Sequence, residues 1–213
     1  MKITYSENRR RAEKAASYDV KYERELHKRL SDWREKRLIG SLLAETGRLE
    51  RMLDVPCGAG RLSPVLARHA EKVFEVDYSR EMLKVCRRNA GGYEPRFAEA
   101  SVFDLPFGDG SFDLVVSIRL SHHIPDRDAR LAHLRELFRS SRRYVLATFF
   151  DENTLKNRLR TLHRKLGGRK RPKHTLTMEE VAGVAEESGF RVVRSRKLSS
   201  IFSGHCFTLF TKA

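Results

Sequence analysis

Leu53-Asp-Val-Pro-Cys-Gly-Ala-Gly-Arg-Leu62 is the stretch of sequence from which the fold can be read. It begins inside a short apolar run at 51–55, which predicts a buried strand, and leads into a helical pattern that extends to Ala70. Gly58 and Gly60 permit backbone conformations and a close ligand approach that a Cβ atom would prevent. Free backbone N–H groups at the start of a helix bind polar ligand groups. The stretch therefore predicts a strand, a ligand-binding turn and a helix.

Outward from this turn, apolar runs alternate with stretches of helical periodicity. Ser79 and Asp126 are typical residues for the first position of two of these helices, and a further helix is predicted at 178–188. The alternation predicts a parallel sheet with helices on both faces, and so an α/β fold with a doubly wound sheet. An earlier helix is predicted at 18–45. The remaining predicted strands are 72–77, 96–98, 112–118, 143–150, 190–193 and 206–210.

Two acidic residues mark the edge of the predicted sheet at which ligands bind. Asp77 ends the second strand, where a carboxylate can accept two hydrogen bonds from the hydroxyls of a ribose. The dinucleotide pattern G-x-G-x-x-G requires a third glycine where Ser63 stands, which argues against NAD. Asp54, four residues before Gly58, suits a ligand that carries an ammonium group rather than phosphates.

Three segments together resemble the class I S-adenosylmethionine-dependent methyltransferases of the ubiquinone-biosynthesis type. LDVPCGAGRL (53–62) is similar to their first motif, and VFEVDYSREML (73–83) to their second. FDLPFGDGSFDLVVSIRLSHHIPD (103–126) is similar to the region around their fourth strand. The resemblance implies an enzyme with a Rossmann-like sheet of seven strands, mostly parallel with an antiparallel last strand, that uses S-adenosyl-L-methionine as its cofactor.

The resemblance also assigns residues to the cofactor. Asp54 and the glycine backbone would hold the methionine moiety, Asp77 the ribose, and Ser101 with Val102 the adenine. Pro56 stands where the family usually has glycine, and Ser101 where it commonly has Asp, so we expect weaker cofactor affinity but not its loss. The full set implied is Asp54, Pro56, Gly58, Gly60, Asp77, Tyr78, Ser101, Val102, Ser117 and Arg119.

Candidate catalytic residues follow the predicted strand at 112–118. His122 and His123 are candidate general bases, because the pKa of histidine lies near the working pH of most enzymes. The alternative is that His123 packs or caps a helix. No residue is assigned to a metal ion, because Cys57, Cys86 and Cys206 form no CxxC pair and indicate reduced thiols rather than a disulfide framework or a zinc site.

Contacts with the methyl acceptor are predicted at four positions. Tyr18 and Tyr22 resemble the N-terminal segment that closes over the cofactor in this family, with an ordinary helix-face contact as the alternative. Arg119 could bind an acidic acceptor or form an ion pair with Asp77 or Asp54. Arg169 belongs to a basic loop that could bind the same acceptor.

A basic insert is predicted at 153–175, and its charges bear on which acceptor or partner the protein binds. Nine Lys or Arg side chains and no acid lie between residues 156 and 174, around leucines spaced as on one helix face. Three interpretations stay open. The insert could be a helix whose leucines cover the domain while its charges face water, or a lid over an acidic acceptor. It could also be a helix at an anionic membrane surface that reaches a lipid-linked acceptor. RNA is a fourth possible partner, less favoured because no aromatic platform accompanies these charges.

Length and charge complete the prediction. The chain has 213 residues and a net charge of +15, with the excess concentrated before residue 50 and after residue 150. We expect a helical N-terminal lid at 1–47 and a methyltransferase domain at 48–213 that contains the insert. No apolar stretch is long enough to span a bilayer, and a cytoplasmic protein that can lie at a membrane surface is expected. The oligomeric state stays open.

The function expected from the resemblance is methyl transfer to a small-molecule or lipid-linked acceptor, at an oxygen of an acidic substrate. Two alternatives remain at this point. One is an RNA-directed methyltransferase, which the net positive charge would favour. The other is a non-catalytic protein that binds the cofactor and acts as the partner of another enzyme, which Pro56 and Ser101 would fit.

Overall fold

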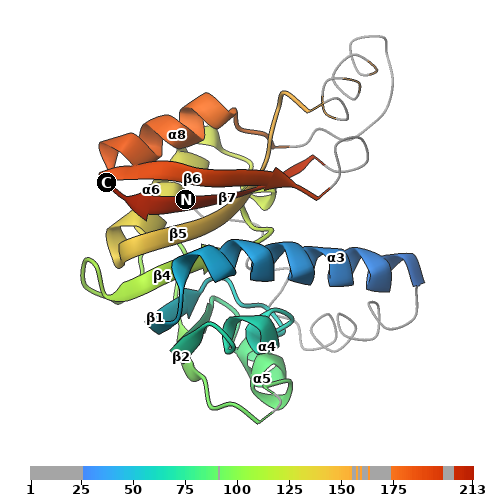
Figure 1. Ribbon diagram of the computed structural model, residues 1–213, viewed down its shortest axis with the longest axis vertical. Coiled ribbons are helices and arrows are strands. Elements are labelled where there is room, and N and C mark those ends of the chain that lie inside the picture. Colours follow the sequence, from blue (N-terminus) through green and yellow to red (C-terminus); the bar gives the residue numbers. More distant parts are fainter. Residues whose placement is uncertain are drawn as a thin grey trace.

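The computed structural model describes residues 26–90, 92–154, 174–198 and 204–213, together with positions 157, 159 and 163. Seven strands and the helices between them follow one another along these residues (Figure 1). The elements are α3 (Leu26–Leu43), β1 (Leu49–Asp54), α4 (Ser63–Leu66), β2 (Ala70–Asp77), α5 (Arg80–Arg88), β3 (Arg96–Glu99), β4 (Phe112–Ser117), α6 (Arg127–Ser140), β5 (Ser141–Phe150), α8 (Met178–Glu187), β6 (Phe190–Lys197) and β7 (His205–Lys212). Short 3-10 turns, η1 and η2, lie at Ala44–Thr46 and Ser121–His123.

All seven strands form one sheet in the order β3-β2-β1-β4-β5-β7-β6. Neighbouring strands from β3 to β5 run parallel, whereas β7 runs antiparallel to both β5 and β6. The order reverses at β1, which has β2 on one side and β4 on the other, so the carboxyl ends of β1 and β4 flank a switch point where ligands bind in such sheets. The predicted seven-stranded, mostly parallel α/β sheet with an antiparallel last strand is confirmed.

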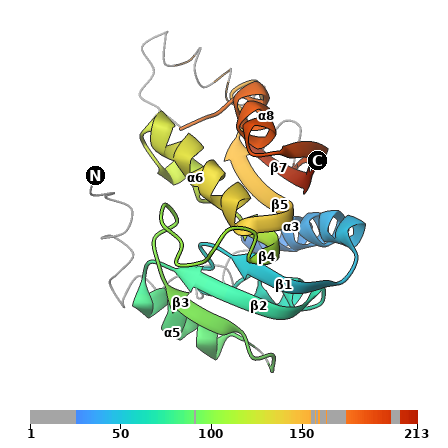
Figure 2. The same ribbon diagram turned by 90° about the vertical axis from the view of Figure 1, so that its left-hand side faces the viewer.

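The helices cover both faces of this sheet, and Figure 2 shows α6 and α3 on opposite sides of it. Successive residues of a strand point to opposite faces, so each buried strand contributes to two cores. Leu53 and Val115 pack with α6 and α8, whereas Met52 and Leu114 pack with α3 and α4. This double burial explains the apolar runs at 114–116 in β4 and 145–147 in β5.

Helix starts agree with the predicted capping residues. The Ser79 hydroxyl accepts a hydrogen bond from the Met82 N–H at the start of α5, and the Asp126 carboxylate accepts one from Ala129 N–H at the start of α6. Thr177 and Glu180 form a reciprocal capping box at α8. No helix in the described segments is long and apolar enough to cross a membrane.

The prediction was wrong about the helix that follows the glycine turn. It was expected to reach Ala70, but α4 ends at Leu66, and Ala70 already begins β2. The backbone tightens after α4: the N–H groups of Arg68 and His69 donate to carbonyls three residues earlier, as in a 3-10 turn. The chain then pairs with β1 through Leu49 N–H and His69 O at 2.9 Å, which ends the helix.

Candidate active site

A cleft lies at the carboxyl ends of β1, β2 and β4. Its walls include the glycine turn, the carboxylates of Asp54 and Asp77, and Arg119 just after β4. The cleft therefore brings together five of the positions assigned to the cofactor: Asp54, Pro56, Gly58, Asp77 and Arg119. Ligands of open α/β sheets bind at this edge.

Asp77 connects the glycine turn to the end of β2. One of its carboxylate oxygens accepts a hydrogen bond from Gly58 N–H at 3.0 Å, and the other accepts one from Ser79 N–H at 2.8 Å. Gly58 has φ +57°, and a Cβ atom there would find no heavy atom of the described residues within 4 Å. The backbone is thus open toward a ligand at Gly58, with a buried carboxylate beside it.

Gly60 lies on the other side of the turn. It has φ +77°, and a Cβ atom on it would come within 2.7 Å of the Cys86 sulfur in α5. Gly60 was predicted to bind the cofactor, whereas in the structure the side on which its Cβ would lie faces α5. Its missing side chain lets the turn pack closely on that helix.

Asp54 sits beneath the cleft, next to a second carboxyl group. It is 2% exposed, and its register partner in β2 is Glu75, which is fully buried. Burial and the neighbouring carboxyl of Glu75 raise the pKa of Asp54 well above its usual range. A cationic ligand group beside Asp54 would favour its charged form, so the position suits the ammonium group for which it was assigned.

Arg119 pairs with a residue that the sequence did not indicate. It was expected to meet either an acidic acceptor or Asp77 or Asp54, but its guanidinium lies 2.8 and 2.9 Å from the carboxylate of Glu35 in α3. Arg61, after the glycine turn, approaches the same carboxylate at 3.1 Å. Glu35 is completely buried, so α3 is held to the rim of the cleft by one carboxylate between two arginines.

Ser117 and Val102 meet at a buried histidine rather than in the lining of the cleft. The Ser117 hydroxyl lies 3.1 Å from His133 Nε2, and the Val102 carbonyl lies 3.3 Å from His133 Nδ1. Burial lowers the pKa of His133 to about 4, so the ring is neutral near pH 7. A neutral ring that donates a hydrogen bond from Nδ1 to the carbonyl can accept one at Nε2 from the Ser117 hydroxyl. Ser101 accepts a hydrogen bond from Phe103 N–H, which closes the loop that carries Val102.

The two candidate bases belong to an aromatic cluster at the same edge of the sheet. His122 and His123 lie in η2, with ring centroids 4.1 Å apart. The His122 ring also lies 4.5 Å from Phe150 at the end of β5 and 5.0 Å from His205 at the start of β7. His205 was not predicted. It reaches this edge because β7 is antiparallel and pairs His205 with Phe150, a relation that only strand register reveals.

Other assigned positions lie elsewhere or outside the described residues. Tyr78 follows Asp77 and is 37% exposed. Tyr18, Tyr22 and Arg169 lie outside the described residues, as do most of the basic insert at 153–175 and the first half of the predicted lid at 1–47. Their assignments stay predictions.

Comparison with known proteins supports the fold and the class of the chain. Residues 53–145 match a family model described as a methyltransferase domain. The chain is 31% identical over 166 residues to a malonyl-[acyl-carrier protein] O-methyltransferase of Geobacter sulfurreducens, covering 74% of this chain and 62% of that protein. It is 37% identical over 102 residues to a demethylmenaquinone methyltransferase of Clavibacter sepedonicus, covering 47% and 41%. The chain therefore spans less than two thirds of these curated relatives.

Among solved structures, the fold is similar to that of magnesium protoporphyrin IX methyltransferase from Synechocystis PCC 6803 with bound SAH. The TM-score is 0.72 at 18% identity, and the match covers 89% of this chain and 88% of that one. This likeness confirms the Rossmann-like methyltransferase fold. The segment at 53–145 that matches the methyltransferase-domain model lies within this fold, in agreement with the resemblance of the chain's motifs to the class I S-adenosylmethionine-dependent methyltransferases.

Proposed function

We propose that this protein transfers the methyl group of S-adenosyl-L-methionine to an oxygen of a small or lipid-linked acidic acceptor. The observation that carries the proposal is the cleft, where an open glycine backbone and two acidic side chains meet at the switch point of the sheet. Relatives named as O-methyltransferases support the choice of oxygen. The net charge of +15 supports an acidic acceptor.

The residues of the cleft fit this cofactor. The open side of Gly58 leaves room for the close approach of a ligand, and the two oxygens of Asp77 can accept hydrogen bonds from neighbouring ribose hydroxyls. Asp54 supplies a carboxylate for the ammonium group. The bound cofactor would supply an electrophilic methyl group on a sulfonium centre. The chain's own residues would then place the acceptor oxygen in line with the bond between the sulfur and the methyl group, and remove the acceptor's proton.

His122 is proposed as the group that removes the acceptor proton. It stands three residues after Arg119, which lines the cleft, and its ring is held among His123, Phe150 and His205. Such packing orients the imidazole, and cationic side chains of the basic insert at 153–175, Arg169 among them, would attract the acidic acceptor. An anionic membrane surface could present a lipid-linked acceptor to the same insert.

Replacing Asp77 by Asn tests the cofactor site. Asn keeps one carbonyl acceptor but loses the negative charge, and a hydrogen bond to a charged group contributes about 1.5–3 kcal/mol, so affinity for S-adenosylmethionine and S-adenosylhomocysteine should fall roughly 10- to 100-fold. Calorimetric titration of the full chain measures this directly. Asp109→Asn, in an exposed loop where Asp109 pairs with Arg139, is the matched control and should bind as the wild type does. Equal affinity of Asp77→Asn and wild type would refute the assignment, and a wild type that binds neither ligand would refute the function.

Replacing His122 by Asn tests the proposed base. A general base contributes about 10²–10⁴-fold to the rate, so kcat for an acidic phenol found by screening should fall by that factor while S-adenosylhomocysteine affinity stays unchanged. His69→Asn, at a turn before β2, is the matched control. Turnover near that of the wild type would place the base elsewhere. Tight cofactor binding without methylation of any acidic phenol or lipid-linked sugar would favour the non-catalytic partner protein.

A further inference from the structure

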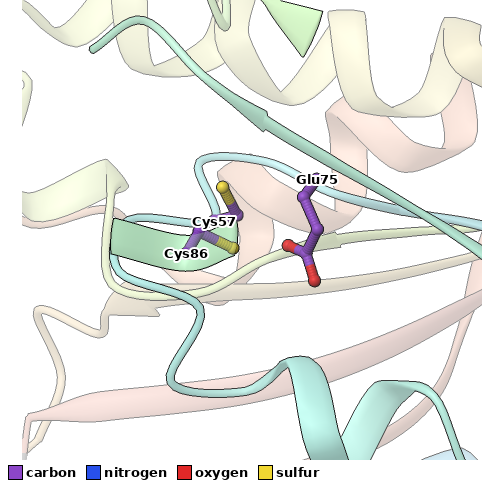
Figure 3. Close-up of side chains that lie close together, drawn as sticks. All are labelled: Cys57, Glu75 and Cys86. Atoms are coloured by element: carbon purple, nitrogen blue, oxygen red, sulfur yellow. The ribbon is translucent and has the colours of Figure 1, made fainter. Parts of the chain in front are cut away.

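Three potential metal ligands from three separate elements converge behind the glycine turn. They are Cys57 of the turn, Glu75 of β2 and Cys86 of α5, and one ligand atom from each lies within 4.8 Å of the other two. Figure 3 shows both sulfur atoms and the Glu75 carboxyl group gathered between these elements. Sequence spacing gives no zinc pattern here, because the turn, the strand and the helix each supply a single ligand.

This cluster is buried and rich in acidic groups. Glu75 and Cys86 are fully buried, and Cys57 is 7% exposed. One oxygen of Glu75 accepts a hydrogen bond from the Tyr93 hydroxyl at 2.5 Å, whereas its other oxygen has no hydrogen-bond partner in the described part of the chain. A buried carboxylate oxygen without a hydrogen-bond partner lowers the free energy of unfolding by about 1–3 kcal/mol or more. The burial of Glu75 therefore calls for an explanation.

Cationic side chains near the cluster are engaged elsewhere. Arg61 is the nearby arginine, and it pairs with Asp32 at 2.5 Å and with Glu35 at 3.1 Å. No ion pair of the described residues involves Glu75. The groups that face the cluster are Asp54 from β1, Ser63 from α4, whose hydroxyl lies 3.9 Å from the Cys86 sulfur, and Tyr93. These neighbours offer oxygen atoms but no positive charge.

We propose that Cys57, Cys86 and Glu75 bind a thiophilic divalent cation of the zinc type. Two thiolates and one carboxylate form a ligand set that suits zinc and its analogues cobalt and cadmium, and does not suit magnesium or calcium. A tetrahedral ion with sulfur ligands at about 2.3 Å holds the two sulfurs about 3.8 Å apart. The donors therefore need to move inward by at most about 1 Å. Ser63 or Tyr93 is placed to supply the fourth ligand.

A divalent cation can enter this cluster without changing its net charge. Binding replaces the two thiol protons, which leave to solvent, with one divalent cation, so two thiolates and one carboxylate around the ion carry the same single negative charge as the two thiols and the carboxylate did before. The free oxygen of Glu75 gains a partner in the same step. Cys57 also lines the cleft, which gives the ion a route to the cluster. The site is independent of methyl transfer, although it would brace the glycine turn from behind.

The test is a titration of the full, phosphine-reduced chain with Co²⁺ and with Cd²⁺. We expect one ion per chain, seen as thiolate-to-metal charge-transfer absorption that saturates at one equivalent. Cys57→Ser and Cys86→Ser should each lose most of this absorption. Glu75→Gln should weaken binding at least as much as the roughly 10- to 100-fold that removal of an outer partner causes. Cys206→Ser is the matched control and should bind as the wild type does, because Cys206 contacts Ser195 of β6 instead.

A second measurement does not depend on the folding of the variants. In the wild-type chain, bound Cd²⁺ should protect Cys57 and Cys86 from alkylation during partial unfolding and leave Cys206 as reactive as without metal, as read by mass spectrometry of the peptides. Absence of saturable binding by the wild type would overturn the proposal. So would charge-transfer absorption that survives in Cys86→Ser or disappears in Cys206→Ser, or protection that is equal at all three cysteines.

Discussion

Replacing Glu35 by Gln is expected to lower the free energy of unfolding by about 3–5 kcal/mol, because it removes one partner of a buried ion pair. The Glu35 carboxylate is completely buried between Arg119 and Arg61, which are 26% and 16% exposed. The neutral amide would remove the negative charge that lies between the two guanidinium groups, and Arg61 would keep its ion pair with Asp32. Since Arg119 and Arg61 also line the cleft, the same change should weaken cofactor binding.

Chemical denaturation of the full chain measures the loss. Glu50→Gln is the matched control, because Glu50 forms exposed ion pairs with Lys72 at 3.8 Å and Arg142 at 3.5 Å. Exposed pairs contribute about 0–1 kcal/mol, so this control should unfold almost as the wild type does. If the two variants lost the same small amount, the contact between α3 and the cleft rim would not be a stabilising ion pair.

Gly60→Ala is expected to destabilise the protein by about 2–5 kcal/mol. A residue with a Cβ at φ +77° adopts the left-handed region at a cost of about 1–2 kcal/mol, and forcing a methyl group into a packed space costs about 1–3 kcal/mol more. The methyl group would lie 2.7 Å from the Cys86 sulfur and 3.2 Å from the Cys86 Cα, so α5 would have to move away from the turn.

Gly58→Ala separates these two contributions. Gly58 has φ +57° but open space on its Cβ side, so only the backbone cost of about 1–2 kcal/mol applies to stability. The added methyl group would instead enter the space proposed for the cofactor. Thermal unfolding with and without S-adenosylhomocysteine should show Gly60→Ala as the less stable variant and Gly58→Ala as the weaker binder. The reverse order would contradict the orientation assigned to the turn.

Local pattern was enough to predict the architecture and the central part of the cleft. Strand, turn and helix at 51–66 follow from apolar periodicity and glycine placement, and Asp77 was expected beside the turn because parallel strands bring their carboxyl ends together. The resemblance to class I S-adenosylmethionine-dependent methyltransferases rested on three motifs in order. The end of α4 was missed because it depends on where β2 begins to pair with β1, which is a property of the sheet rather than of residues 63–70.

Contacts between distant segments lay beyond sequence reasoning. Glu35 pairs with Arg119, which lies 84 positions further along the chain. The spacing of charges along α3 gives no reason to single out Glu35 from the other charged residues of this helix. His205 reaches His122 only because β7 inserts next to β5, and the sulfur and carboxyl ligands of the proposed metal site come from a turn, a strand and a helix. Ser117 was assigned from the motif, yet its hydroxyl turns to His133 because strand alternation puts it on the face covered by α6.

The position of β7 has a consequence for synthesis of the protein on the ribosome. β7 lies between β5 and β6, although it is made after both. Until residues 205–212 emerge, β6 has no strand beside it and β5 is an open edge whose residues are largely apolar. Such edges pair readily with other chains. A nascent chain that pauses before β7 therefore exposes this edge to other chains, and the sheet is complete only when β7 inserts between the two strands made before it.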